Sequence, residues 1–223
     1  MAALTHRSLV AVLVLLVGAS ACQRTVEHPL FPLEAGRKWI YLITTEPNDG
    51  EEPIALQVTT VGPETLEGQR VVRQQIELGD ETHFRFMAVD ERGVYRYATQ
   101  SAGEASPTLE LGRDDLIVLD PQKGSSWRGE AAFSFLDGPD RVPIESVVEL
   151  TNDTVDVPAG RFPGCVKVRV SGQARVGERT LTLTEQVWYA KGVGMVKSIV
   201  EESESGPEPR SVRVTTELAS YSL

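Results

Sequence analysis

Hydrophobic and polar residues alternate along much of this chain. Strict alternation occupies residues 39–43, 82–86, 180–187 and 211–218. A period of two, combined with β-branched and aromatic residues, is typical of half-buried β-strands. Turn-forming runs rich in Gly, Asp and Pro separate such segments, at 48–50, 78–80, 91–93, 137–140 and 205–207. This spacing predicts an all-β, mainly antiparallel fold.

We expect a single strongly curved sheet that forms an incomplete β-barrel, with a β-sandwich as the alternative. Ordinary strand lengths give roughly nine to twelve strands. The best candidate for a helix is a short, weak one within residues 101–115. Two segments, 33–39 and 121–127, each place a Gly shortly before a Trp that opens a strand. This faint repeat, unless it arises by chance, indicates two similar meanders within one domain.

The alternation also predicts which side chains face the interior of the curved sheet. These inward positions are Trp39, Tyr41, Phe84, Phe86, Val168, Val170, Leu181, Leu183, Val212 and Val214. If the interior is open, the candidate ligand-binding residues are Trp39, Tyr41, Phe84, Phe86, Leu181 and Leu183. If it is filled, these residues are core.

The N-terminus has the pattern of a secretory signal that ends at a lipid attachment site. Arg7 precedes an apolar run over residues 9–17, which is too short to span a bilayer. Small residues then lead directly to Cys22. This resembles the bacterial lipobox, although Ala19 stands where that motif usually has Leu. We therefore expect a signal peptide at 1–21, a lipidated tether at 22–32 and one β-rich domain at 33–223.

Composition narrows the choice of partners and compartment. The net charge of −10 opposes binding to nucleic acid, whose phosphates the protein would repel. Acyl chains on Cys22 would hold the protein on a membrane. Gln23 after the Cys favours outer-membrane delivery, facing the periplasm, in bacteria that use Asp as a retention signal. Cys165 then remains as the one other cysteine, so no intramolecular disulfide is expected.

The sequence carries little catalytic chemistry. Zinc motifs, nucleophile elbows and phosphate-binding loops are missing, and acidic doublets lack calcium-loop spacing. Alternation places His83 opposite Phe84 and leaves Cys165 as a buried thiol on another strand, so we expect neither to carry function. We expect no enzyme activity, metal or cofactor, although a carboxylate pair assembled across strands stays open as a hydrolase alternative.

Three segments together resemble a known group of proteins. They are residues 31–41, 157–168 and 187–197, with the order Gly-x-x-Trp, Pro-Ala-Gly-x-Phe and Trp-Tyr-Ala-x-Gly-Val-Gly. The order is similar to that of exported bacterial lipoproteins of unassigned function related to the incomplete β-barrels LolA and LolB. The resemblance implies a curved sheet that can hold a lipid or acyl chain. Its motifs specify turns and packing rather than chemistry.

Two non-catalytic functions follow from these observations. The first is an envelope lipoprotein that binds a lipid or other apolar ligand in its curved sheet. The second is a partner-binding or structural subunit of a cell-envelope complex. An open concave face lined by apolar side chains would favour the first, and a filled core with an exposed apolar patch would favour the second.

Overall fold

The computed structural model describes residues 28–47, 50–139 and 141–222, and in this part of the chain every long element is a strand. The predicted signal peptide, Cys22 and the first half of the predicted tether lie outside the described residues, as do Asn48, Asp49 and Asp140 of two predicted turns. The twelve strands are β1 (Lys38–Glu46), β2 (Ile54–Leu66), β3 (Gln69–Leu78), β4 (Glu81–Val89), β5 (Gly93–Ser101), β6 (Thr108–Val118), β7 (Ser126–Ala131), β8 (Val142–Val157), β9 (Gly160–Val176), β10 (Arg179–Ala190), β11 (Gly194–Ser205) and β12 (Arg210–Ser222).

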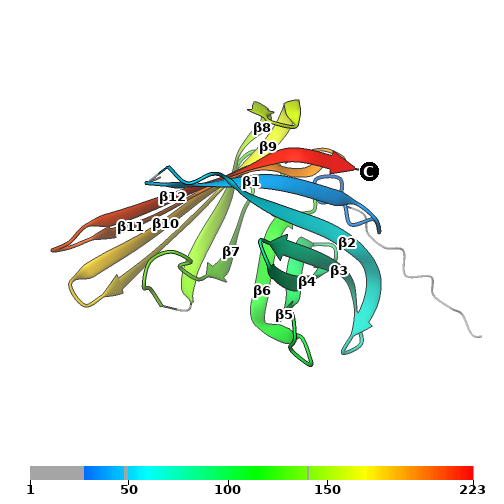
Figure 1. The fold of residues 1–223 in the computed structure, drawn as a ribbon, viewed down its shortest axis with the longest axis horizontal. Coiled ribbons are helices and arrows are strands. Elements are labelled where there is room, and N and C mark those ends of the chain that lie inside the picture. The colour runs from blue at the N-terminus through cyan, green and yellow to red at the C-terminus, as the bar shows by residue number, and fades with distance from the viewer. Residues whose placement is uncertain (1–27, 48–49, 140, 223) are drawn as a thin grey trace, which may run out of the picture.

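The strands form one antiparallel sheet, in the order β6-β5-β4-β3-β2-β1-β12-β11-β10-β9-β8-β7. β1 to β6 form one meander, β7 to β12 form another, and β1 pairs with β12 to join them. Figure 1 shows the sheet curving round until its two edge strands, β6 and β7, lie side by side. The architecture is the predicted curved sheet, consistent with an incomplete barrel, and the sandwich alternative is excluded.

All four alternating segments lie in strands, namely β1, β4, β10 and β12. The weak helix expected within 101–115 is wrong, because the chain turns at 102–107 and then enters β6. β6 pairs with β5 through Ala98 and Leu109, and again through Arg96 and Asp114. Pairing to a neighbouring strand satisfies backbone groups that a short, uncapped helix would leave exposed.

The faint sequence repeat corresponds to equivalent backbone hydrogen bonds in the two meanders. Before β1, the Gly36 N–H donates to Thr60 O at 2.8 Å, and the Thr60 N–H returns a bond to Arg37 O. Before β7, Gly124 and Val148 make the same pair of bonds, at 2.8 and 2.9 Å, with Ser125 in place of Arg37. The repeat therefore marks how each meander begins.

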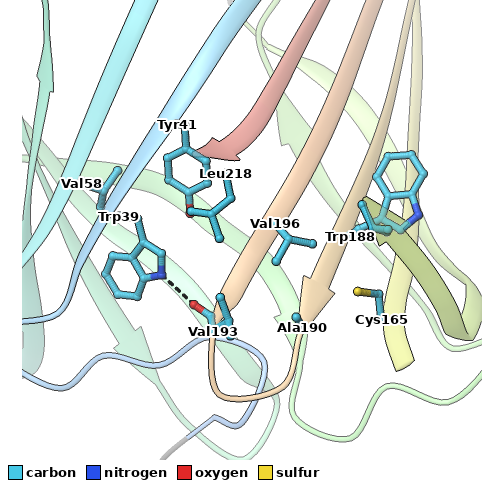
Figure 2. Packing of buried hydrophobic residues seen from close by; sticks show 10 residues of the cluster. Trp39, Tyr41, Val58, Cys165, Trp188, Ala190, Val193, Val196 and Leu218 are labelled. Atoms are coloured by element: carbon cyan, nitrogen blue, oxygen red, sulfur yellow. Dashed lines mark hydrogen bonds between the residues drawn. The ribbon is translucent and has the colours of Figure 1, made fainter. Parts of the chain in front are cut away.

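The tryptophan of each repeat links its meander to the other one. Trp39 in β1 donates its indole N–H to Val193 O at 2.7 Å, in the turn between β10 and β11 (Figure 2). Trp127 in β7 donates to Asp115 O in β6 at 2.9 Å. Arg141, just before β8, adds an ion pair with Glu110 of β6 at 3.7 Å. Side chains thus connect β6 and β7, the two edges of the sheet.

Residues that precede β1 pack against the barrel. His28 is 3% exposed and Leu30 7%, and Leu30 belongs to a core cluster with Met87 and Ile117. The His28 ring bonds Val118 O through Nε2 at 2.9 Å, and its Nδ1 accepts the Leu30 N–H at 3.2 Å. Residues 28–32 of the predicted tether therefore pack as part of the folded unit.

A second core cluster lies around β1 and the β10–β11 turn. It joins Trp39 and Tyr41 with Cys165, Trp188 and Leu218 (Figure 2). The far end of the β8–β9 hairpin packs on it through Val155 and Phe162. There the Ala159 N–H donates to Leu218 O at 2.9 Å, which fixes the hairpin against β12.

Candidate functional site

The curved sheet encloses a cavity of about 510 Å³. Pockets of roughly 300–1,000 Å³ are the usual size for small-molecule ligands. Side chains from both meanders line the cavity, and Phe31 and Pro32 of the N-terminal segment join them. The apolar part of the lining includes Leu56, Val58, Ile76, Val168, Val170 and Val187. The interior is therefore open in part and mainly apolar.

Half of the residues predicted to bind a ligand line this cavity. Trp39 and Tyr41 of β1 and Leu183 of β10 all do. Tyr41 is nearly buried, its hydroxyl donates to Met195 O at 3.1 Å, and burial raises its pKa. Leu181 is fully buried further along β10 and is not part of the lining. Of the other predicted inward positions, Val168 and Val170 line the cavity, and Val212 and Val214 do not.

Phe84 and Phe86 do not face the cavity, so their predicted orientation is wrong. Between them on β4 lies Arg85, which lines the cavity. Because successive side chains of a strand point to opposite faces, both phenylalanines lie on the other face. There Phe86 is 1% exposed and packs with Val71 and Ala98 in a separate core cluster. The sheet buries apolar side chains on both faces here, so hydrophobicity did not identify the inner face.

Arg85 is the residue at this site that hydrophobic patterning missed. Its Nε donates to Gln74 Oε1 at 2.8 Å, and Gln74 in turn donates to Thr60 Oγ1 at 3.1 Å. Gln74 and Thr60 are each 1% exposed. This chain of hydrogen bonds fixes the guanidinium in place. The signal that could have found it is a charged residue between two aromatic ones in a strand.

Burial lowers the pKa of the Arg85 guanidinium, which nevertheless stays charged because arginine does not deprotonate in proteins. Tyr41, Arg96 and Tyr189 lie near enough to influence that pKa. Among the side chains that the structure describes, none forms an ion pair with Arg85. The ring of Phe31 lies 6.0 Å from its guanidinium carbon.

Most other charged groups at the cavity have partners of their own. Arg96 pairs with Glu110 at 2.9 Å, and Glu130 pairs with Arg141 at 2.6 Å. Asp115 pairs with Arg92 at 2.9 Å. The carboxylate-bearing residue Glu185 of β10 also has an interaction partner. Of the two arginines in the lining, Arg96 has a carboxylate partner, whereas Arg85 has none among the described side chains.

Glu202 of β11 holds the loop between β7 and β8 over the cavity. Its carboxylate accepts three backbone N–H bonds, from Ser134 at 2.6 Å and from Phe135 and Leu136 at 2.9 Å each. Glu202 is 1% exposed, and Ser134 and Ala132 of the loop line the cavity. The loop is thus attached to the sheet by one buried carboxylate.

His83 and Cys165 lie on separate strands, β4 and β9, as expected. The His83 ring contacts Glu81 Oε2 at 3.2 Å, and the Cys165 thiol donates to Phe162 O at 3.3 Å. Burial, with a smaller contribution from Asp153, raises the pKa of the Cys165 thiol to about 11. A thiol in this environment is a poor nucleophile.

Residues 28–47, 50–139 and 141–222 contain no group of three or more His, Cys, Asp or Glu side chains placed to hold a metal ion. Nor does any helix among them have the length and hydrophobicity needed to cross a membrane.

Comparison with known proteins adds a partial family match. A family described as DUF3108-like matches residues 147–205, a stretch that contains the segments 157–168 and 187–197 noted above. No curated protein matches the sequence significantly. The resemblance to LolA and LolB stays a prediction.

Two solved structures resemble the chain in fold. A "putative lipoprotein" from Parabacteroides distasonis is 13% identical with a TM-score of 0.41, over 88% of this chain and all of that one. A "putative exported protein with YmcC-like fold" from Bacteroides fragilis is 16% identical with a TM-score of 0.39, over 86% of this chain and 98% of its own. At these values neither protein informs the function of this chain.

Proposed function

We propose that this protein is a non-catalytic, lipid-anchored protein of the bacterial cell envelope that holds a lipid or other apolar ligand inside its curved sheet. The cavity carries the proposal, since it has the volume of a ligand site and a mainly apolar lining. The signal-like N-terminus with Cys22 supports the envelope location, and Gln23 favours the outer membrane, facing the periplasm. An anchored domain would work close to the bilayer, where apolar ligands are abundant.

The alternative function, partner binding, draws less support from the surface. The large hydrophobic residues that are exposed are Ile54, Val61, Phe135, Leu150 and Tyr221. They lie on β2, the β7–β8 loop, β8 and β12, so they come from different parts of the sheet. Isolated exposed apolar residues are normal on soluble domains, whereas partner sites are usually contiguous patches.

The test is whether the protein keeps a ligand when it is purified from its own membrane. Native mass spectrometry of the full-length protein should show an additional apolar molecule. Val170→Trp, which places a larger ring in the cavity, should remove that molecule. Arg169→Trp is the matched control, because Arg169 is next on the same strand and pairs with Glu149 on the other face at 2.8 Å.

The control should keep the ligand. A wild-type protein that carries no molecule and binds no added lipid would contradict the proposal. Equal ligand retention by the Val170→Trp variant would place the ligand outside this cavity.

A further inference from the structure

The charged Arg85 side chain inside the cavity affects which kind of hydrocarbon-containing ligand can bind there. A wholly apolar ligand would leave the Arg85 guanidinium facing hydrocarbon, which is costly for an unpaired charge. Arg85 has five N–H donors, and the one on Nε is used by Gln74. The donors on its two terminal nitrogens have the planar fork geometry that suits a carboxylate or a phosphate.

Other polar side chains lie near Arg85 in the cavity. The hydroxyl of Tyr189 and the guanidinium of Arg96 lie within electrostatic range, and both side chains line the cavity. Arg96 already pairs with Glu110 at 2.9 Å, so the positive potential that favours an anion at this point comes from Arg85. The acidic side chain of Glu202 belongs to the other part of the cavity, where three backbone N–H bonds already satisfy it.

The two ends of the cavity also differ in chemistry. Tyr189 and Arg85 mark one end, beside Phe31 and Met195. Leu183, which pairs with Glu202 in register, lies toward the loop between β7 and β8. From Tyr189 to Leu183 the strand runs about 20 Å at about 3.3 Å per residue. Between these ends the cavity is lined by apolar side chains, including Val187 and Val170, and by Glu185 of β10, which already has an interaction partner.

We infer that the ligand is an anionic amphiphile, whose carboxylate or phosphate head pairs with Arg85 and whose hydrocarbon chain extends along β10 toward Leu183. This inference rests on the proposed function and specifies its ligand class. The head group takes the unused guanidinium donors, and Gln74 keeps the arginine oriented. The chain occupies the apolar lining.

The test compares head groups on one chain length. Full-length protein, purified in detergent and stripped of ligand, is incubated with palmitate, hexadecyl phosphate or hexadecanol and analysed by native mass spectrometry. A charge-assisted hydrogen bond to arginine predicts roughly ten- to hundredfold tighter binding of at least one anionic probe than of hexadecanol. The better of the two anionic probes shows whether the site prefers a carboxylate or a phosphate.

Substitutions at Arg85 test whether this residue causes the preference for an anionic head group. Arg85→Met should remove the preference while hexadecanol still binds, and Arg85→Lys should keep part of it, because lysine supplies charge without the fork. Arg213→Met is the control, since Arg213 pairs with Glu201 at 3.0 Å and does not line the cavity. A far-UV spectrum checks that each variant folds, and the wild-type preference is a test that needs no variant.

The outcomes separate the two proposals. If hexadecanol binds as tightly as both anionic probes, the cavity binds apolar ligands and the head-group inference is wrong. If Arg85→Met keeps the wild-type preference, the inference is also wrong. If none of the three probes binds, the proposed function itself fails.

Discussion

Replacing Glu202 with Gln tests how the loop between β7 and β8 is held. Both carboxylate oxygens accept bonds, Oε1 from the Ser134 N–H and Oε2 from the N–H groups of Phe135 and Leu136. The amide keeps the shape but turns one acceptor into a donor. In either orientation, at least one backbone N–H then faces an NH₂ group. The remaining bonds also weaken because the charge is lost.

The expected cost follows from these contacts. A hydrogen bond to a charged group contributes about 1.5–3 kcal/mol, and a buried donor without a partner costs about 1–3 kcal/mol. With Glu202 only 1% exposed, water cannot replace the lost bond in place. We therefore expect the free energy that holds the loop to fall by about 2–4 kcal/mol. The amides of Ser134, Phe135 and Leu136 should then exchange hydrogen roughly 30- to 1,000-fold faster.

Hydrogen exchange read by mass spectrometry measures the loop, and urea unfolding measures the whole domain. Glu201→Gln is the control, because Glu201 is the next residue and forms a half-exposed ion pair with Arg213 at 3.0 Å. Surface pairs of this kind contribute at most about 1 kcal/mol. Wild-type exchange at the three loop amides in Glu202→Gln, or an equal effect of both substitutions, would refute this account of the loop.

Four further predictions concern other parts of the chain. Cys22→Ala should abolish labelling by palmitate in cells, and persistent labelling would show that the lipid is elsewhere. Burial lowers the pKa of the His28 imidazole below its ordinary 6.5. The stability that His28 contributes should therefore be lost as the pH falls below 6.5 through the folded-state pKa. Hydrogen-exchange protection of the Leu30 amide, which donates to His28 Nδ1, should fall over the same pH range after correction for intrinsic exchange. Gly93→Ala should cost more than about 2 kcal/mol in urea unfolding, because φ is +147° and a Cβ would lie 2.1 Å from Ile117 O, whereas an unchanged midpoint would contradict the clash. Cys165, with a pKa raised to about 11, should react with iodoacetamide at pH 8 far more slowly in the folded protein than in urea, and equal rates would be inconsistent with its burial.

Local pattern was sufficient to predict the antiparallel, strand-rich class of the fold, because strand and turn signals depend on neighbouring residues. Residues 180–187 alternate strictly, and they lie in the middle of β10. The pairing of β1 with β12 joins residues more than 160 positions apart, and alternation contains no information on it. The helix expected within 101–115 failed for the same reason. The backbone partner of β6 is β5, and a tertiary pairing overrides a weak local preference.

The site was less predictable than the fold, because lining a cavity is a property of the face and not of the residue type. Trp39 and Tyr41 alternate with β-branched and polar neighbours on β1 and were placed on the correct face. On β4 the same rule chose Phe84 and Phe86, since a hydrophobic residue is usually assigned to the interior. There the outer face is also buried, against Val71 and Ala98, and the inner face carries Arg85. A buried charge is tolerated only when its hydrogen bonds are satisfied, which Gln74 and Thr60 do for the Nε side of this one. The terminal nitrogens of Arg85 are therefore the most distinctive chemical feature of the cavity. Their position depends on how β2, β3 and β4 are placed in three dimensions, which the alternation of residues along one strand cannot indicate.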